Sequence, residues 1–312
     1  MNIAIVGGGS IGGLFAAKMV KSGIKNILVH SRGKMGEKFL TTGITIQGLE
    51  DFTVPTDSFF PSIQEVGVPQ NWESSADIVI VSGKSTSSES LIEVANYLGN
   101  PKTIFLAVSN GIGWEEILAD KFGKSRVLAA TTTHAAIRQK DGSITYTGIG
   151  KVTLGSINGT SVESYFEIMK LFEKSGLFPE WVDDGSVAIW EKAIINAAIN
   201  PLAAITGVKN GELLNGNNWF TSLEIMYEAC SVARTHGVNI RPDDRMESYL
   251  RLVLESTREN TCSMGQDLIH GRVTEIDFIN GKIVEIAELY GIPVPFNRLL
   301  TTLIKMSEPK FV

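Results

Sequence analysis

The chain has 312 residues, a formal net charge of −6, two cysteines and four histidines. This length allows more than one hydrophobic core, because single cores stop growing near roughly 250–300 residues. The modest acidity gives no general reason to expect nucleic acid or an anionic membrane as a partner. Cys230 and Cys262 lie far apart and the histidines are scattered, so we expect neither a metal site nor a disulfide framework.

The N-terminus joins an apolar strand to a glycine-rich turn. Residues 2–6 are typical of a buried parallel strand and lead into the sequence Gly7, Gly8, Gly9, Ser10, Ile11, Gly12. In this G-x-G-x-x-G pattern, Gly7 permits a tight turn, Gly9 lets the backbone approach a pyrophosphate, and Gly12 lets the next helix pack closely. A merely glycine-rich turn is the alternative. The position between a strand and a helix favours a dinucleotide site.

The second strand, at residues 26–30, ends where the adenosine ribose is normally recognised. Arg32 and Lys34 follow it, and no carboxylate stands there. A guanidinium suits a 2′-phosphate, whereas Asp or Glu suits a free 2′-hydroxyl. We therefore expect NADPH rather than NADH or FAD. The alternative is that both cations are solvated loop charges.

The rest of the first half alternates strands with helices. Strands are expected at 44–46, 77–81, 103–107 and 126–129, with helices at about 87–98 and 113–121, which predicts an α/β doubly wound sheet of the Rossmann type. Ligands in such sheets bind beyond the carboxyl ends of the strands, where Lys84 and Asn110 stand, although each also fits an ordinary turn. His134 is more typical of a structural hydrogen-bonding residue than of a base.

The first domain is expected to end at residue 183. A hairpin turn at residues 141–142, a strand at 151–154, a helix at 162–175 and a strand at 178–182 complete it. Residues 184–312 show helical periodicity at about 186–205, 219–236, 243–260, 264–270, 274–290 and 296–306, which predicts an all-α second domain. Its polar candidates include Asn260, Ser263 and Glu275, although Thr274 and Glu275 equally fit a helix cap.

One helix of the second domain carries an unusual polar stripe. Within the largely apolar residues 186–202, Lys192, Asn196 and Asn200 recur every fourth residue, so they share one helix face. Burying such groups without partners costs about 1–3 kcal/mol for each amide and more for the ammonium. We infer that a substrate meets them. A solvent-facing stripe is the alternative.

With these residues in view, the whole chain resembles the ketopantoate reductase (2-dehydropantoate 2-reductase) family. The similarity lies in residues 7–12, 110–111, 131–135, 190–192 with Asn196, 200–202, 210–213 and 274–281. The resemblance implies an NADPH-binding domain followed by a helical domain, with the substrate in the cleft between them. It also implies reduction of a 2-ketoacid in pantothenate synthesis, which leads to coenzyme A.

The resemblance also implies residue roles. Lys192 would be the acid and Glu275 its acidic companion, while Arg32 and Lys84 match the adenosine 2′-phosphate side. The remaining expected contacts surround the substrate, at Asn110, Asn196, Asn200, Asn260 and Ser263. Those of the cofactor are Gly7, Gly8, Gly9, Ser10, Ile11, Gly12, Arg32, Lys84, Asn110 and Glu275.

The predicted reaction is hydride transfer from NADPH to the C2 carbonyl of 2-dehydropantoate, with Lys192 as the proton donor. One alternative is a similar reductase of another branched ketoacid or of an imine. Another is a non-catalytic NADPH-sensing module, which would need the glycine-rich loop but no proton donor. We expect a cytoplasmic protein without a metal, with a small-molecule partner, and regard the apolar helical half as a candidate homodimer surface.

Overall fold

The structure is a computed structural model that describes residues 1–83, 88–108, 110–157 and 165–309. Contacts divide the chain into two compact units, Met1–Ser109 with Trp114–Ser186, and Asn110–Gly113 with Val187–Val312. The boundary expected at residues 183 and 184 falls in the link between the last strand of the first unit and the helix that opens the second. Of the predicted site residues, Lys84 lies outside the described residues. No helix in the described ranges has the length and apolarity needed to cross a bilayer.

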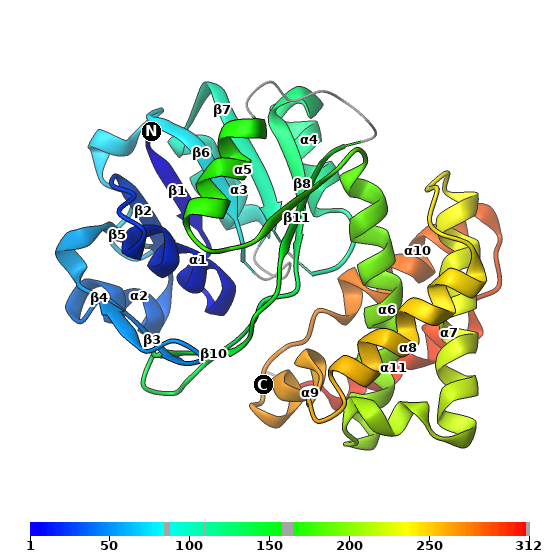
Figure 1. Ribbon diagram of the computed structural model, residues 1–312. Coiled ribbons are helices and arrows are strands. Elements are labelled where there is room, and N and C mark those ends of the chain that lie inside the picture. Colours follow the sequence, from blue (N-terminus) through cyan, green and yellow to red (C-terminus); the bar gives the residue numbers. More distant parts are fainter. Residues whose placement is uncertain (84–87, 109, 158–164, 310–312) are drawn as a thin grey trace. The chain divides into compact units, whose positions relative to one another are not determined.

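The first unit is built on a sheet whose strands follow the order β12-β11-β8-β7-β6-β1-β2-β5. Neighbouring strands are parallel except β11, which runs antiparallel to β8. The predicted doubly wound sheet is therefore confirmed (Figure 1). The strands span Ile3–Val6 (β1), Ile27–Ser31 (β2), Phe60–Ile63 (β5), Ala76–Val81 (β6), Gly99–Val108 (β7), Val127–Thr132 (β8), Val152–Ser156 (β11) and Pro179–Val182 (β12).

Helices cover both faces of this sheet because successive residues of a buried strand point to opposite sides. Ile3 and Ile5 pack in one core with Phe15 and Phe172, whose rings lie edge to face, 5.7 Å apart. Phe105 instead stacks on Phe122, with ring centroids 3.8 Å apart. The helices span Ser10–Lys21 (α1), Gly33–Thr41 (α2), Ser88–Leu98 (α3), Trp114–Phe122 (α4) and Tyr165–Lys174 (α5).

A second, smaller sheet corrects part of the prediction. Its order is β4-β3-β10-β9, with bounds Phe52–Val54, Ile44–Gly48, Ile144–Gly148 and Ala135–Arg138. The hairpin predicted at residues 141–142 is confirmed, with Ile144 opposite Arg138. The strand at 44–46, however, joins this small sheet by pairing with β10. We did not predict β4, β5 or α2; β5 contains Pro61, which weakens a strand pattern and is confined to sheet edges.

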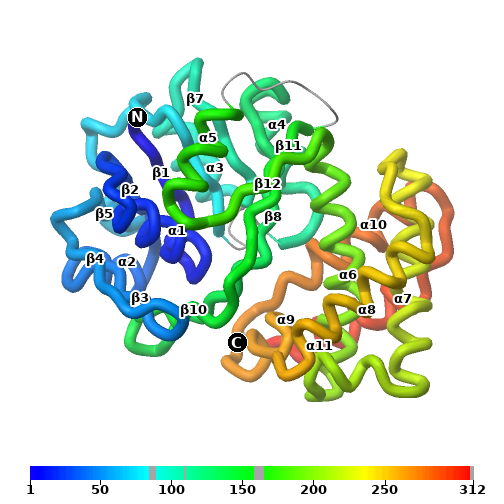
Figure 2. The backbone as a smooth tube through the Cα atoms, viewed as in Figure 1, coloured from blue at the N-terminus to red at the C-terminus, as the bar shows by residue number. Residues whose placement is uncertain are grey.

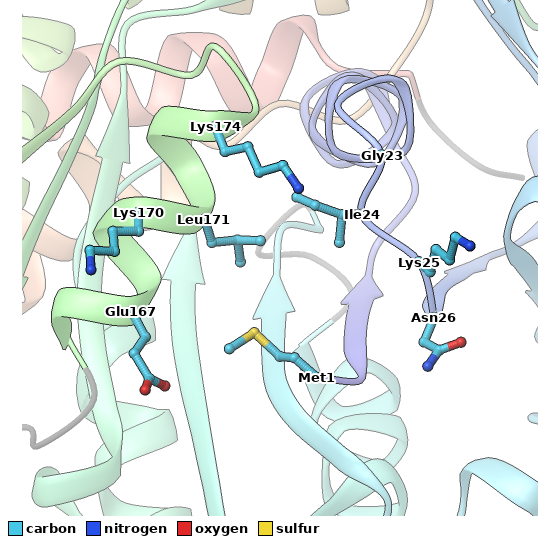
Figure 3. A pocket seen from close by; sticks show the side chains of 9 residues that line it. All are labelled: Met1, Gly23, Ile24, Lys25, Asn26, Glu167, Lys170, Leu171 and Lys174. Carbon is cyan, nitrogen blue, oxygen red and sulfur yellow. The ribbon is translucent and has the colours of Figure 1, made fainter.

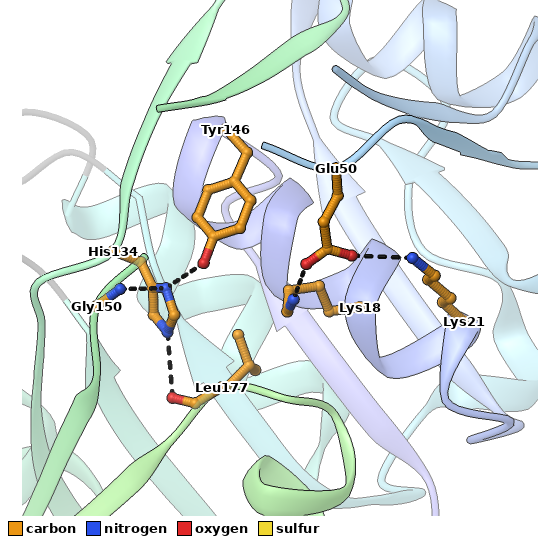
Figure 4. A network of polar contacts seen from close by, with 7 residues as sticks. All are labelled: Lys18, Lys21, Glu50, His134, Tyr146, Gly150 and Leu177. Carbon is orange, nitrogen blue, oxygen red and sulfur yellow. Dashed lines mark hydrogen bonds and ion pairs between the residues drawn. The ribbon is translucent and has the colours of Figure 1, made fainter. Parts of the chain in front are cut away.

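His134 has a structural place in the first unit. Its Nδ1 lies 2.8 Å from the hydroxyl of Tyr146 and accepts a hydrogen bond from the backbone N–H of Gly150, and its Nε2 lies 3.1 Å from the Leu177 carbonyl oxygen (Figure 4). Burial lowers the pKa of His134, which favours the neutral ring. Nearby, the carboxylate of Glu50 accepts from both Lys18 and Lys21. These contacts join α1 to the small sheet.

The second unit is helical in its described residues (Figure 2). Trp190, which is almost fully buried, packs in one core with the apolar residues of α6 and α7. The helices span Gly185–Thr206 (α6), Gly216–Thr235 (α7), Asp243–Ser256 (α8), Ser263–Ile269 (α9), Asn280–Tyr290 (α10) and Pro295–Ser307 (α11), with 3-10 turns at Asn210–Leu214 (η5) and Ile276–Phe278 (η6).

The helix predicted at 274–290 is wrong in its first turn. The short turn η6 and the helix α10 are separated by Ile279, whose ψ of −96° does not continue a helix. Glu275 precedes η6 and makes no side-chain cap there. The capping alternative therefore holds for Thr274, whose hydroxyl accepts from the Ile276 N–H at 3.2 Å, whereas the Glu275 carboxylate accepts from the side chain of Asn110.

Candidate active site

The polar stripe predicted on residues 186–202 lies on α6. Lys192 and Asn196 are half-buried, and Asn200 is 5% exposed. The residues between them, such as Ile194 and Ala197, are fully buried in the helical core. A single turn of helix therefore separates each polar group from the next, with apolar packing on the remaining faces.

Asn110 joins Lys192 to Glu275. The Nζ of Lys192 donates to Asn110 Oδ1 at 2.9 Å, and Asn110 Nδ2 donates to Glu275 Oε2 at 3.1 Å. An amide held at both ends, by a cation on its oxygen and by an anion on its nitrogen, has one favourable orientation. The structure thus brings together three predicted residues from parts of the chain that are far apart in sequence.

The turn that carries Asn110 requires a glycine. The backbone N–H of Ile112 donates to the carbonyl of Phe278 at 2.8 Å, which places the turn against η6. Gly111 has φ +96°, and a Cβ there would lie 2.4 Å from the Phe278 carbonyl oxygen. The Asn-Gly pair is therefore a turn whose tight contact holds the asparagine beside Lys192.

The environment of Lys192 lowers its pKa to about 8. Burial is the main cause, since it penalises the charged amine, and the negative charge of Glu275 opposes the shift. A lysine with a pKa near neutrality is protonated at pH 7 and gives up its proton more readily than an exposed lysine. The site can therefore act as a general acid.

Asn200 and Ser263 lie next to each other. Asn200 Nδ2 is 3.5 Å from Ser263 Oγ, and the thiol of Cys262 donates to the Asn200 carbonyl at 3.3 Å. The same sulfur accepts from the Gly265 N–H at 3.2 Å and so caps α9. These contacts fix the start of α9 against α6, which places an exposed hydroxyl at the end of the polar stripe.

The other two predicted substrate contacts have fewer interactions. The side chain of Asn196 makes no hydrogen bond within the described part of the chain, so its amide can meet a ligand. Asn260 is exposed, and its backbone carbonyl accepts from the backbone N–H of Asn210 at 3.0 Å. What the structure shows for Asn260 is therefore a main-chain contact.

The glycine-rich loop of the first unit is packed tightly at two of its glycines and open at a third. A Cβ on Gly7 would lie 2.4 Å from the Gly83 nitrogen, and one on Gly12 would lie 2.3 Å from the Gly7 carbonyl oxygen, so both positions require glycine. At Gly9, in contrast, a Cβ would meet no atom of the described residues within 4 Å. Gly9 precedes α1 without a side-chain cap, which leaves the positive end of this helix open to an anion.

Arg32 lies immediately before α2, and it has an acidic neighbour that the sequence did not suggest. The carboxylate of Glu65 accepts from the Gly33 N–H at 3.2 Å and so lies at the start of the same helix. Glu65 follows β5, the strand next to β2. We missed it because β5 is a short edge strand, and only its pairing with β2 brings the two loops together.

A separate hollow in the first unit does not belong to this site. Figure 3 shows its lining, which includes the lysines at 25, 170 and 174 together with Met1 and Glu167. Met1 lies two residues before β1 and Asn26 directly precedes β2, so the hollow lies at the amino ends of these strands. Dinucleotides bind at the opposite, carboxyl edge.

The comparisons with solved structures agree with this architecture. The structure of 2-dehydropantoate 2-reductase from Geobacter metallireducens GS-15 has a TM-score of 0.87 at 26% identity and covers 98% of this chain and 100% of its own. The ternary structure of D-mandelate dehydrogenase with NADH and anilino(oxo)acetate has a TM-score of 0.89 at 24% identity and covers 98% of both chains. The second likeness shows the fold alone.

The sequence comparisons identify the family. Family models described as ketopantoate reductase PanE/ApbA and its C-terminal domain match residues 3–159 and 186–308. The 2-dehydropantoate 2-reductase of Pyrococcus horikoshii is 33% identical over 99% of this chain and 98% of its own length. That of Archaeoglobus fulgidus is 33% identical over 97% and 96%. The resemblance inferred from the motifs is confirmed: the chain belongs to the ketopantoate reductase PanE/ApbA family and is an oxidoreductase of this family.

Proposed function

We propose that the protein is an NADPH-dependent 2-dehydropantoate 2-reductase, which reduces 2-dehydropantoate to pantoate for pantothenate and coenzyme A synthesis. The observation that carries the proposal is the chain of contacts from Lys192 through Asn110 to Glu275, with the pKa of Lys192 lowered to about 8. A cofactor-sensing module needs no such proton donor. The relatives that the chain matches over nearly its full length bear the name of this reductase.

Lys192 first polarises the C2 carbonyl of the substrate with its ammonium and then donates a proton to the developing alkoxide. Proton donation by a positioned side chain typically contributes about 10²–10⁴-fold to the rate. Asn110 holds the ammonium in place through its Oδ1. Glu275 keeps enough negative charge nearby for the amine to remain protonated at neutral pH, and it accepts a hydrogen bond from a substrate hydroxyl.

The amides and the hydroxyl hold the substrate. Asn196 and Asn200 can donate to or accept from the ketoacid without changing the charge of the site. Ser263 donates its hydroxyl proton to the substrate carboxylate from the position next to Asn200. These roles use neutral groups for binding and leave the single ammonium of Lys192 for the reacting oxygen.

The residues of the first unit fit a dinucleotide. The open space above Gly9 and the uncapped start of α1 fit the pyrophosphate, with Ser10, Ile11 and Gly12 forming the first helical turn. When bound, the reduced nicotinamide supplies the hydride that adds to the carbonyl carbon. Arg32, beside the start of α2, would contact the adenosine 2′-phosphate.

The preference for NADPH rests on Arg32, and one observation favours NADH. The carboxylate of Glu65 lies at the start of α2, where it could accept a hydrogen bond from a free ribose hydroxyl and would repel a 2′-phosphate. A guanidinium can pair with both the phosphate and the carboxylate, so we retain NADPH as the proposed cofactor.

The deciding experiment measures oxidation of NADPH and of NADH by the pure protein with 2-dehydropantoate and a set of branched and unbranched 2-ketoacids. We expect the highest kcat/KM with NADPH and 2-dehydropantoate. A higher value for another ketoacid, or for an imine, would assign a different substrate to the same site. Tight NADPH binding without reduction of any of them would support the sensing module.

A further inference from the structure

Pro201 leaves one carbonyl of α6 without its helical donor. Pro201 lies inside α6, and the helix continues beyond it to Thr206. Because proline has no N–H, the carbonyl of Ala197 loses the bond that residue 201 would normally donate, and the ring crowds this carbonyl. Ala197 is fully buried. A buried carbonyl needs another donor, since water cannot reach it.

Asn280 supplies that donor. Its Nδ2 donates to the Ala197 carbonyl at 3.2 Å and to Asn297 Oδ1 at 3.0 Å. Asn280 is 0% exposed, and its Oδ1 has no hydrogen-bond partner among the described residues. The side chain of Asn280 therefore acts here only as a donor, and its bond to the Ala197 carbonyl replaces the one that Pro201 cannot make.

The network continues into two further helices. Asn297 Nδ2 donates to the Ile225 carbonyl at 3.1 Å and to Glu228 Oε2 at 2.8 Å. Glu228 also accepts from the backbone N–H groups of Phe296 and Asn297, each at 3.0 Å, at the start of α11. Asn280, at the start of α10, thus holds α6 in a buried network that also fixes α7 and α11.

The same short segment organises the candidate active site. Residues 275–280 carry Glu275, and the Phe278 carbonyl holds the turn of Asn110 through the N–H of Ile112. Asn280 ends this segment and binds the backbone of α6 at Ala197, next to Asn196. Lys192, Asn110 and Glu275 are therefore all attached to residues 275–280. Glu275 belongs to this segment, and hydrogen bonds to the backbone connect it to the turn of Asn110 and to the helix of Lys192.

We propose that Asn280 is a positioning residue for the reaction. By replacing the missing donor at Pro201, it fixes α6, and with it Lys192, against the segment that carries Glu275 and holds Asn110. This inference rests on the proposed function, because it assigns Asn280 to the geometry of ketoacid reduction. A misplacement of about 1 Å at a reacting group can cost roughly 10²-fold in rate.

The test is the variant Asn280→Ala, alone and combined with Pro201→Ala. The single variant should lower kcat by about 10- to 100-fold and leave the Kd for NADPH unchanged, because the glycine-rich loop belongs to the other unit. Pro201→Ala restores an N–H to the helix, so the double variant should regain most of the lost kcat. Asn297→Ala is the matched control. It removes an amide of the same network, and Pro201→Ala should not rescue it.

Thermal unfolding separates positioning from folding. Asn280→Ala should lower Tm by about 5 °C, and Pro201→Ala should recover part of this loss in the double variant. A folded Asn280→Ala protein with the wild-type kcat would overturn the inference. Recovery of Tm in the double variant without recovery of kcat would also overturn it, since the loss of kcat would then not arise from the missing donor to the Ala197 carbonyl. A wild-type protein that reduces no ketoacid overturns the proposed function instead, and the Tm measurements still test the bond to Ala197.

Discussion

The two units build their candidate sites in different ways. In the first unit, the candidate cofactor loop is a continuous stretch whose proposed function depends on the absence of side chains at Gly7, Gly9 and Gly12. In the second unit, the site consists of side chains from segments that are distant in sequence, joined through Asn110. A phosphate can be bound by backbone N–H groups, whereas proton transfer needs a titratable side chain with a controlled pKa. Mutations in the first unit should therefore mainly affect the affinity for NADPH, and mutations in the second unit should mainly affect kcat.

The largest effect is expected from Lys192→Ala. Removal of the proton donor should lower kcat by about 10²–10⁴-fold and leave the Kd for NADPH unchanged. The control is Lys305→Ala, which removes an exposed lysine paired with Asp277 and should keep kcat near the wild-type value. An unchanged kcat in Lys192→Ala would remove this residue from the mechanism.

In contrast to Lys192→Ala, the variant Gly9→Ala in the first unit should change the affinity for NADPH. Apart from its neighbours in the chain, the new methyl group meets no atom within 4 Å in the part of the protein that the structure describes, but it enters the space assigned to the pyrophosphate. The Kd for NADPH should rise about tenfold or more, equivalent to at least ~1.4 kcal/mol, with Tm unchanged. Gly12→Ala is the contrasting variant, because its Cβ would clash with the Gly7 carbonyl oxygen and should lower Tm. Wild-type NADPH binding by Gly9→Ala would show that the pyrophosphate lies elsewhere.

Arg32→Ala tests the cofactor preference. Loss of a charge-assisted hydrogen bond to the 2′-phosphate should raise the Kd for NADPH about tenfold and leave that for NADH within about twofold. Both constants can be measured by titration of nucleotide fluorescence, without a ketoacid. An equal change for the two nucleotides would mean that Arg32 does not contact the 2′-phosphate.

The pH profile tests the second unit. The proposed mechanism uses Lys192 in its protonated form, and its pKa is lowered to about 8, so kcat should fall as the pH rises through that value. Glu275 raises the pKa of Lys192, so Glu275→Gln should move this break to lower pH. The measurement is kcat between pH 6 and pH 10 at saturating substrate, with those limits chosen to span the pKa by about two units on each side. If the break in kcat stays at the same pH in Glu275→Gln, Glu275 does not influence the pKa of Lys192.

The smallest effect is expected from Glu65→Gln. Removing this carboxylate from the start of α2 should lower the Kd for NADPH by about threefold, since one repulsive charge beside the phosphate is lost at an exposed position. Glu37→Gln, an exposed change of the same charge on α2, is the control. A weaker affinity for NADPH in Glu65→Gln would mean that Glu65 supports Arg32 rather than opposing the phosphate.

Several features could be predicted from the sequence because they depend on neighbouring residues. The glycine pattern after residues 2–6 and the spacing of Lys192, Asn196 and Asn200 follow from the geometry of a turn and of one helix. The hairpin at residues 141–142 follows from turn chemistry. In contrast, the separate small sheet, the edge strand β5 and the break at Ile279 depend on pairing and packing with distant segments.

The sequence by itself determined the glycine loop, the polar stripe of α6 and the order of an α/β unit before an α-helical one, since each is encoded by local periodicity and composition. Only the tertiary structure decided that Asn110 lies between Lys192 and Glu275, that Glu65 lies at the start of α2, and that Asn280 serves the carbonyl freed by Pro201. Such contacts join residues far apart along the chain. Their formation depends on how whole helices and strands pack, which a local pattern does not specify.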